Sequence, residues 1–397
     1  MKEIKRSYLE TLKKVMGGSD IKVITGVRRS GKSTLMKTFI EYVAKNITDV
    51  NIIYIDFNSL DYEFLQEYHA LNNFIEEHYL EGKKNFLFID EVQMCSNFEK
   101  TINSLHNSNK YDIYLTGSNA FLLSSDLATL FTGRVFPIEI FPFSFREFLD
   151  YFNNKDNIYE MFDRYLWEGG FAGSYIYDDA PEKYRYITNV YDTLIMRDIT
   201  QKYSIRNTPI LHEVSDFLLD NISRFTTSRN LTNTLISGKQ ETNHKTVGMY
   251  LSYFCNAYAF YKVKRYDIEG KEYLHSRDKY YLVDHSIKMA KLGTKNADFG
   301  SIYENIVAME LLRRKYEIYV GTLRDKEIDF IAKKSDEKFY IQVSMDISDE
   351  KTFQREVKAL LEIKDAYPKI LIARTRQPER QYEGVKIIDI ADWLTRE

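Results

Sequence analysis

Two stretches of this chain carry side chains that together could bind and hydrolyse a nucleoside triphosphate. In the first, residues 26–33 read Gly-x-x-x-x-Gly-Lys-Ser, between an apolar run and a helical pattern. Gly26 and Gly31 allow backbone angles that bring loop amides onto phosphate oxygens at a helix N-terminus. Lys32 would then bridge the β- and γ-phosphates, and the Ser33 hydroxyl would bind Mg²⁺. A chance glycine turn is the alternative, and the flanking patterns argue against it.

The second stretch, residues 85–91, is an apolar run that ends in two carboxylates. At the end of a strand, Asp90 can order the Mg²⁺ shell and Glu91 can polarise a water for attack on the γ-phosphate. The alternative is an acidic pair that is simply exposed at the start of a loop. Combined with a phosphate-binding loop, the pattern favours hydrolysis, and we expect ATP and Mg²⁺ as ligands.

Two later segments could complete such a site. Residues 113–120 form an apolar run that ends in small polar side chains. Thr116, Ser118 or Asn119 could hydrogen-bond the γ-phosphate or the attacking water, although a plain turn is the alternative. Arg134 precedes the next apolar run. Its guanidinium suits the charge that develops on a transferring phosphoryl group, in its own site or a neighbour's, but a structural arginine fits the spacing equally well.

The elements that must position these residues alternate along the first third of the chain. From residue 21 to 143, apolar runs alternate with amphipathic helices, which is typical of an α/β fold with a mostly parallel sheet. The expected strands there are residues 22–25, 51–56, 85–90, 113–116 and 136–140. The remaining chain is expected to be helical over 145–206 with a glycine break at 167–173, then three helices and a basic hairpin over 210–290, and finally helices with strands at 318–323, 328–332, 339–343 and 370–373.

A basic region in the middle of the chain could bind nucleic acid. Residues 229–236 and 243–254 read as two helices joined by a short polar turn, as in a helix-turn-helix, and residues 262–271 follow as a wing would. Between residues 221 and 275, eight Lys and Arg stand against four Asp and Glu, in a chain of net charge −3. Duplex DNA contact and a docking role for a protein partner are equal alternatives. The residues expected at DNA are His244, Lys245, Lys262, Lys264 and Arg265.

The order of the motifs resembles that of prokaryotic AAA+-superfamily ATPases that carry a C-terminal domain of unknown function. The similarity covers nearly the whole chain and rests on the phosphate loop, Phe-Ile-Asp-Glu-Val-Gln at 88–93, Leu-Thr-Gly-Ser-Asn at 115–119, Thr-Gly-Arg at 132–134 and Phe-Pro-Phe-Ser-Phe-Arg-Glu-Phe at 141–148. One departure is Ala172, which stands where these proteins commonly have a proline after Gly-Gly-Phe.

The resemblance implies four parts and a set of site residues. The parts are a P-loop ATPase core over residues 1–143, a helical lid or connector over 144–208, a winged helix over 209–292 and a PD-(D/E)xK-like nuclease fold over 293–397. The implied nucleotide contacts are Gly26, Val27, Arg28, Arg29, Ser30, Gly31, Lys32, Ser33 and Thr34. By the same resemblance, Asp90 is the residue that orders the metal and Glu91 the one that activates the water. Ser118 is the sensor residue, and Arg134 is the arginine that acts on the transferring phosphoryl group.

The nuclease-like part departs from what cleavage needs. A PD-(D/E)xK nuclease has an Asp on one strand and, on the next, a carboxylate and a lysine separated by one residue. Glu304 and Asp329 fit the first acidic positions, whereas Gln342 and Ser344 stand where the second carboxylate and the lysine should be. A neutral amide is a weak metal ligand and serine supplies no cation, so we predict a nuclease-like fold without nuclease activity.

Composition sets further bounds on the function. The 397 residues, 44% of them apolar, suffice for two or three domains. Cys95 and Cys255 lie far apart without histidines at metal-ligand spacing, which argues against a zinc site or a disulfide framework. Neither a signal-like start nor an apolar run of membrane-spanning length is present, so we expect a cytoplasmic protein without a membrane partner.

We therefore predict an ATP-driven conformational switch or motor whose C-terminal parts dock DNA or a protein partner. One alternative is an ATP-gated nuclease in genome defence, in which Lys351 or Lys358 would reach in for the missing lysine. Another is a regulator that binds ATP without hydrolysing it. The oligomeric state stays open, because an Arg134 that acts in a neighbour's site would require a homo-oligomer.

Overall fold

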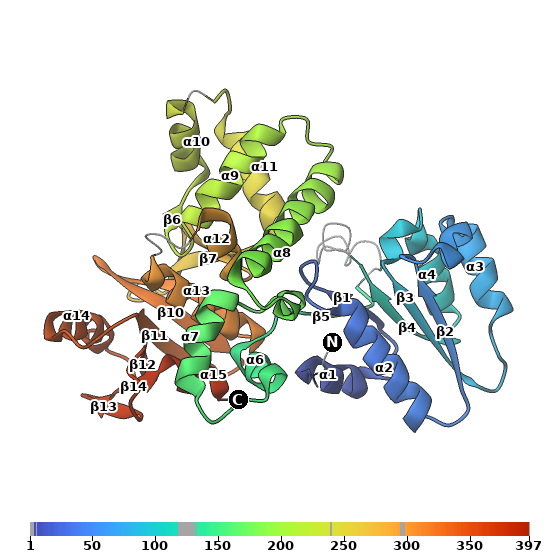
Figure 1. The fold of residues 1–397 in the computed structure, drawn as a ribbon, viewed down its shortest axis with the longest axis horizontal. Coiled ribbons are helices and arrows are strands. Elements are labelled where there is room, and N and C mark those ends of the chain that lie inside the picture. Colours follow the sequence, from blue (N-terminus) through green and yellow to red (C-terminus); the bar gives the residue numbers. More distant parts are fainter. Residues whose placement is uncertain are drawn as a thin grey trace. The chain divides into compact units, whose positions relative to one another are not determined.

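A five-stranded parallel sheet organises the N-terminal part of the protein (Figure 1). The computed structural model describes residues 4, 6–117, 131, 133–238, 240–293 and 298–396, without the side chains of residues 275 and 276. Within this range the chain forms two compact units. The N-terminal unit comprises Glu3–Phe141 and Leu194–Ser204, and the C-terminal unit comprises Pro142–Thr193 and Ile205–Glu397.

The sheet of the N-terminal unit has the order β2-β3-β4-β1-β5, and every neighbouring pair is parallel. Its strands are β1 (Ile21–Thr25), β2 (Val50–Asp56), β3 (Lys84–Asp90), β4 (Tyr111–Thr116) and β5 (Val135–Glu139). Its helices include α1 (Ser7–Val15), α2 (Lys32–Asn46), α3 (Tyr68–Glu77) and α4 (Phe98–Asn107), with short 3₁₀ turns at η1 (Leu60–Leu65) and η2 (Val92–Met94). The predicted α/β fold with a parallel sheet is confirmed.

Both faces of this sheet are buried, which explains the continuous apolar runs in its strands. On one face, alternate residues of the strands pack against Leu71 and Ile75 of α3 and Ile102 of α4. On the other face, Phe39 of α2 packs against Tyr114, with ring centroids 5.1 Å apart. Figure 1 shows α2 and the α3–α4 pair on opposite sides of the sheet. The carboxyl ends of β1, β3 and β4 therefore meet at one well-supported edge.

A mixed nine-stranded sheet organises the C-terminal unit, in the order β13-β14-β12-β11-β10-β9-β7-β8-β6. Its strands are β6 (Phe225–Thr226), β7 (Phe260–Asp267), β8 (Glu272–Leu282), β9 (Glu317–Leu323), β10 (Lys326–Lys334), β11 (Glu337–Ser344), β12 (Lys369–Ala373), β13 (Arg380–Tyr382) and β14 (Val385–Asp389). Its helical segments are α6 (Phe145–Phe152), α7 (Ile158–Glu168), η3 (Ala172–Ile176), α8 (Ala180–Thr193), α9 (Thr208–Asp220), α10 (Ser228–Ser237), α11 (His244–Asn256), α12 (Ser286–Leu292), α13 (Phe299–Arg313), α14 (Glu350–Leu361) and α15 (Ile390–Thr395).

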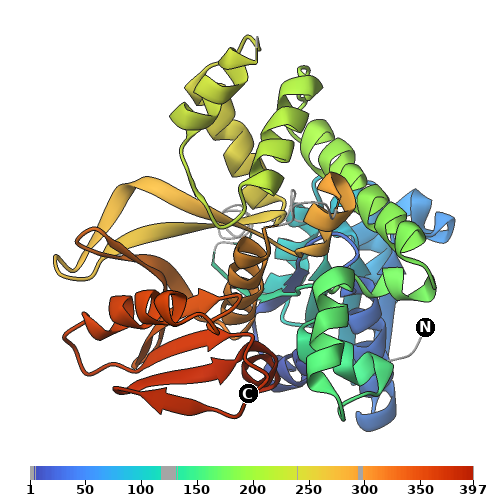
Figure 2. The same cartoon turned by 60° about the vertical axis from the view of Figure 1, so that its left-hand side comes forward.

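The basic hairpin belongs to this large sheet. β7 pairs in parallel with β9, so the β7–β8 hairpin continues the strands of the C-terminal region, as Figure 2 shows. One sheet thus crosses the predicted boundary between residues 292 and 293. The two-helix prediction matches α10 and α11, whereas β6, β13 and β14 were not expected, and of these β6 and β13 are only two and three residues long.

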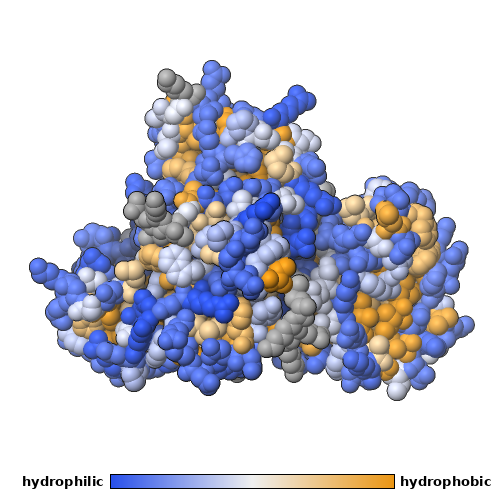
Figure 3. Space-filling model, in the orientation of Figure 1, coloured by the Kyte–Doolittle hydropathy of each residue, from blue (hydrophilic) through white to orange (hydrophobic). Residues whose placement is uncertain are grey.

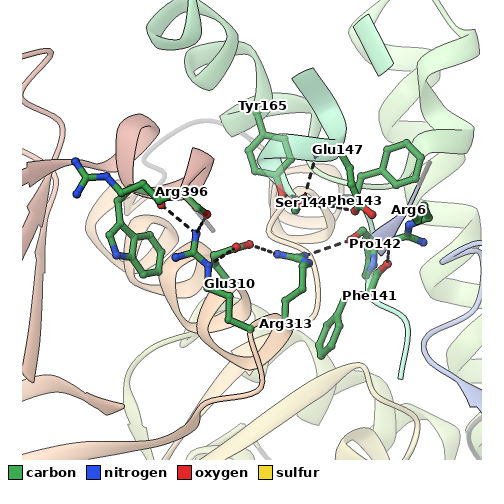
Figure 4. A network of polar contacts seen from close by, with 12 residues as sticks. Arg6, Phe141, Pro142, Phe143, Ser144, Glu147, Tyr165, Glu310, Arg313 and Arg396 are labelled. Carbon is green, nitrogen blue, oxygen red and sulfur yellow. Dashed lines mark hydrogen bonds and ion pairs between the residues drawn. The ribbon is translucent and has the colours of Figure 1, made fainter. Parts of the chain in front are cut away.

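The glycine break at residues 169–170 is required by close packing. Gly169 has φ +64°, and a Cβ there would lie 2.2 Å from a carboxylate oxygen of Asp284. The Gly170 amide donates to the same carboxylate at 2.7 Å. Nearby, Figure 4 shows Arg313 paired with Glu310 and donating to the Pro142 carbonyl. The packing of Gly169 and Gly170 against Asp284 fixes the turn that the glycine cluster predicted.

Candidate functional site

The loop after β1 has the geometry of a phosphate cradle. Gly26 has φ +133°, and a Cβ there would lie 2.0 Å from the Ile140 carbonyl oxygen, so no larger residue fits. Gly31, with φ +97°, is the N-cap of α2, whose first turn therefore presents free amides beside the loop. The residues between these two glycines thus follow the turn that the sequence pattern predicted.

Lys32 is buried in this loop without a carboxylate partner of its own. Its ammonium donates to the carbonyl oxygens of Gly26 at 2.9 Å and Val27 at 3.2 Å. Burial lowers the pKa of Lys32, and the nearby charges of Glu91 and Asp198 oppose that shift. The Ser30 hydroxyl is also buried and makes no hydrogen bond. A buried cation held only by backbone carbonyls is ready for a stronger, anionic partner.

Asp90 lies at the same edge of the sheet, because β3 and β4 run parallel to β1. The Thr116 hydroxyl donates to one Asp90 oxygen, and the other oxygen is buried without a hydrogen bond. Burial raises the pKa of Asp90, while contacts with Thr116 and Ser33 work against the rise. An uncompensated carboxylate oxygen beside the Ser33 hydroxyl suits a hard cation, so these two residues fit Mg²⁺. Such a site takes its remaining ligands from phosphate and water.

Glu91 follows directly and is held in an unusual backbone conformation. Its φ of 57° and ψ of 49° lie in the left-handed region, and its amide donates to the Thr116 hydroxyl at 3.0 Å. The Gln93 side-chain amide donates to its carboxylate. Backbone strain of this kind persists only where the surroundings hold it, and it is frequent at functional sites. The structure therefore brings together Lys32, Ser33, Asp90 and Glu91, with Thr116 bridging the last two.

Arg134 is not part of this group. It precedes β5, and since Ile21 pairs with Val135 it lies at the amino end of the strands, roughly 15 Å from the phosphate loop along β1. Its guanidinium donates to the Asn107 side chain at 2.6 Å. A role in the chain's own site is therefore contradicted by the sheet geometry, and a role in a neighbour's site stays a prediction. Ser118 and Asn119 lie outside the described residues.

Two charged residues near the loop were missed by the sequence analysis. Arg6 is buried and donates to the carbonyl oxygen of Ser30 at 2.7 Å and to that of Phe141 at 2.7 Å, the second contact being visible in Figure 4. Asp198 pairs with Arg28 of the loop. Neither belongs to a recognisable motif, so no local signal could have found them.

A further segment, residues 109–112, reads Asn-Lys-Tyr-Asp and matches the Asn-Lys-x-Asp pattern that reads guanine in some nucleotide-binding proteins. Asp112 lies near the amino end of β4, the edge opposite the loop. Its carboxylate accepts from Lys22 at 2.6 Å and from the Gly17 amide at 2.8 Å. Because this carboxylate already pairs with Lys22 and the Gly17 amide, the segment does not argue for a guanine nucleotide, and ATP stays the predicted ligand.

The residues expected at DNA differ in whether they contact other side chains of the protein. His244 and Lys245 are exposed at the start of α11, which the Asn243 side chain caps. Lys264 is exposed on β7. In contrast, Lys262 lies 3.7 Å from Asp278, and Arg265 donates to the Thr322 hydroxyl at 3.0 Å. His244, Lys245 and Lys264 are therefore the better candidates. Figure 3 shows hydrophilic and hydrophobic colours mixed over the part of the surface that holds α10 and α11, where Ile236 and Met249 are exposed.

Three of the four nuclease-like positions, Glu304, Asp329 and Gln342, lie close together in the C-terminal unit. The Gln342 side chain accepts from the Asp329 amide at 3.3 Å, and the Val343 amide donates to the Asp329 carboxylate at 2.8 Å. Glu304 of α13 accepts from Tyr281 at 2.6 Å. The Ser344 hydroxyl instead donates to the Asp346 carbonyl, outside this group.

Lys279 of β8 supplies a cation there that the sequence analysis did not anticipate. Its ammonium lies 2.8 Å from Glu304 and 2.5 Å from Glu327. Burial alone would lower the pKa of Lys279, but these carboxylates and Asp329 outweigh it and raise the pKa. Burial, followed by the charge of Glu304, raises the pKa of Asp329 well above its usual range. Lys351 and Lys358 are exposed on α14.

Comparisons with known proteins give a family for the N-terminal part. Residues 18–149 match a family model described as an AAA domain, and residues 159–298 match a domain of unknown function, DUF8612. An uncharacterized protein of Haemophilus influenzae is 38% identical over 398 residues, covering 98% of both chains. The uncharacterized protein MJ1544 of Methanocaldococcus jannaschii is 28% identical over 85% of this chain and 77% of its own.

Among solved structures, AMPPCP-bound DnaA from Aquifex aeolicus shares 17% identity over 64% of this chain and 88% of its own, with a TM-score of 0.34. The Aeropyrum pernix ORC1 protein in complex with DNA shares 9% identity over 79% and 95%, with a TM-score of 0.32. None of the helices in the described ranges combines the length and apolar character that crossing a membrane requires.

Proposed function

Because this chain belongs to the same family as the Haemophilus influenzae protein and carries an AAA domain, we propose that it is a Mg²⁺-dependent ATPase. It would act as a conformational switch or motor whose C-terminal parts dock DNA or a protein partner. The observation that carries the proposal is the buried, uncompensated oxygen of Asp90 beside Ser33, next to the buried ammonium of Lys32. The Asp90 oxygen makes no hydrogen bond and the Lys32 ammonium contacts only backbone carbonyls, and a Mg²⁺-bound triphosphate would supply both with stronger partners.

The roles of the residues follow from their positions. Ser33 and Asp90 would hold Mg²⁺, which neutralises phosphate charge when bound. Lys32 would exchange its two carbonyl acceptors for phosphate oxygens, a stronger, charge-assisted pairing. Glu91 would orient the attacking water and accept its proton, and Thr116 would hold the Asp90 carboxylate and the Glu91 backbone amide in place.

The remaining parts of the chain would respond to the conformational change that ATP hydrolysis produces. We propose an ATPase core at residues 1–143, a connector at 144–208, and a winged helix at 209–292 whose β7–β8 hairpin shares its sheet with an inactive nuclease-like part at 293–397. Support for a docking role comes from the exposed His244, Lys245 and Lys264. A homo-oligomer would let Arg134 serve a neighbour's site.

The test is ATP binding and single-turnover phosphate release by matched variants. Lys32→Ala should weaken ATP binding about a hundredfold or more, which is about 2.7 kcal/mol. Lys45→Ala is the control, since Lys45 lies on the same helix with 76% of its side chain exposed. If Lys32→Ala binds and hydrolyses ATP like the wild type, the proposal is wrong.

Adding duplex DNA separates the proposal from its alternatives. DNA that speeds phosphate release supports a DNA-coupled ATPase. Mg²⁺-dependent DNA cleavage that disappears in Asp329→Ala would support the nuclease. Tight ATP binding without turnover would support a non-hydrolysing regulator.

A further inference from the structure

The phosphate loop is tied to a segment that is more than 160 residues away in the sequence. Arg28 donates from Nε to one oxygen of Asp198 at 3.2 Å and from a terminal nitrogen to the other at 2.8 Å. The two side chains are 23% and 8% exposed. A two-pronged, largely buried pair of this kind is strong and geometrically specific.

Asp198 lies in a segment that is irregular in a way that often marks function. Residues Leu194–Gln201 form a π-helix, and the segment Leu194–Ser204 packs as part of the N-terminal unit. Ile195 and Ile199 are buried there. Helical turns of this wider kind are rare and frequently found at functional sites. The chain enters this segment directly from α8 and leaves it at Ile205, and both flanking stretches belong to the C-terminal unit.

A bound triphosphate would compete with Asp198 for the same cation. Asp198 acts electrostatically on Lys32 as well as on Arg28, so its negative charge lies close to where phosphate charge would enter. One guanidinium fork can hold one carboxylate or one phosphate in the two-pronged manner. Phosphate also repels the carboxylate, which adds to the competition.

We propose that Asp198 is a positioning residue that holds Arg28 in the nucleotide-free protein and yields it to the γ-phosphate of ATP, which releases the segment Leu194–Ser204. This inference rests on the proposed ATP-binding function and adds its regulation. Nucleotide state would then be passed to the C-terminal unit through the segment that connects directly to α8. ADP lacks the γ-phosphate and should leave the pair intact.

The test is hydrogen exchange of peptides that cover residues 194–204, in a Glu91→Gln background with Mg²⁺–ATP, with Mg²⁺–ADP and without nucleotide. ATP should speed exchange of this segment about tenfold, while ADP should leave it unchanged. Asp198→Asn should exchange rapidly without nucleotide and bind ATP about tenfold more tightly, because the competing carboxylate charge is gone. Asp198→Glu should partly restore the nucleotide response. Peptides from β3 and β4 report whether each variant is folded.

Arg197→Ala is the matched control, since Arg197 is the exposed neighbour of Asp198 on the same segment. It should respond to ATP like the wild type. A merely structural ion pair would give the same exchange with and without ATP. Unchanged exchange in a protein that binds ATP therefore overturns the proposed role of Asp198 alone. A wild type that fails to bind ATP overturns the proposed function, and the proposed role of Asp198 with it.

Discussion

Both units of this protein bury a lysine among carboxylates, but the two centres are partnered in opposite ways. In the N-terminal unit, the Lys32 ammonium contacts two backbone carbonyls, and an oxygen of Asp90 has no hydrogen bond. In the C-terminal unit, the Lys279 ammonium lies within 2.8 Å of Glu304 and within 2.5 Å of Glu327. Accordingly, the pKa of Lys32 is lowered and the pKa of Lys279 is raised.

We call Lys32 and Asp90 the open centre, because their buried charges lack strong partners and could take a ligand. We call Lys279, Glu304 and Glu327 the closed centre, because their charges compensate one another. Buried charges without strong partners cost stability, and proteins keep them where a ligand compensates for the cost. A buried lysine with two carboxylates already has its compensation, and its removal leaves uncompensated charge. The comparison therefore predicts ligand binding at the first centre and a structural role at the second.

The largest expected effect is on turnover at the open centre. Glu91→Gln should retain ATP binding and slow phosphate release by about a hundredfold to ten-thousandfold, because the amide cannot accept the water's proton. Single-turnover phosphate release measures this. The control is Glu41→Gln on α2, whose side chain is 63% exposed. At the closed centre, Asp329→Asn should leave turnover unchanged, and a comparable loss there would break the comparison.

The next effect is on stability at the closed centre. Lys279→Met should destabilise the C-terminal unit by about 3 to 5 kcal/mol, because Glu304 and Glu327 lose their buried counter-ion. Urea unfolding followed by tryptophan fluorescence reports this unit, since both tryptophans, Trp167 and Trp393, belong to it.

Lys351→Met on the exposed face of α14 is the control for that measurement. Lys32→Met should behave oppositely and leave the N-terminal unit as stable as the wild type or more so, as read from hydrogen exchange of β3 and β4. If Lys32→Met costs as much stability as Lys279→Met, the distinction between open and closed centres is wrong.

A smaller effect, on the pH dependence of ATP binding, follows from the lowered pKa of Lys32. Because burial lowers the pKa of Lys32 below 10.5, a rise in pH should discharge it before exposed lysines and weaken ATP binding. Lys32→Arg stays charged and should show a flatter affinity profile over about pH 7 to 10. Equal slopes for the two proteins would contradict the lowered pKa.

The pKa shifts of Lys32 and Lys279 predict opposite changes of stability with rising pH. The folded pKa of Lys32 lies below the unfolded value, so stability of the N-terminal unit rises as pH increases from the folded pKa towards 10.5. The folded pKa of Lys279 lies above the unfolded value, so its contribution is fully present below 10.5 and is lost as pH rises through the folded pKa. Urea unfolding of wild type and Lys279→Met at rising pH measures the second trend.

The open centre was largely predictable from the sequence, and the closed one was not. Gly26 to Ser33 and Asp90–Glu91 are local patterns, because loop conformation and buried strands are encoded by neighbouring residues. Lys279, Asp198 and Arg6 are single charged residues whose partners come from distant elements. Their roles depend on strand order and helix placement, which one sequence does not reveal. The positions of Glu304 and Asp329 were found, but the cation that pairs with Glu304 and Glu327 comes from a hairpin that we had expected to be a separate wing.

The smallest expected effect concerns Arg134, which belongs to neither centre. Arg134→Ala should change ATP affinity by less than about twofold, since the guanidinium lies at the opposite edge of the sheet and only its contact with Asn107 is lost. Turnover in dilute protein should also stay unchanged. If Arg134 serves a neighbour, wild-type turnover rises with protein concentration, and the rise disappears in Arg134→Ala. Asn107→Ala is the matched control, because it removes the same contact and leaves the guanidinium in place. A loss of ATP affinity in dilute Arg134→Ala would instead place the arginine in its own site and contradict the sheet geometry.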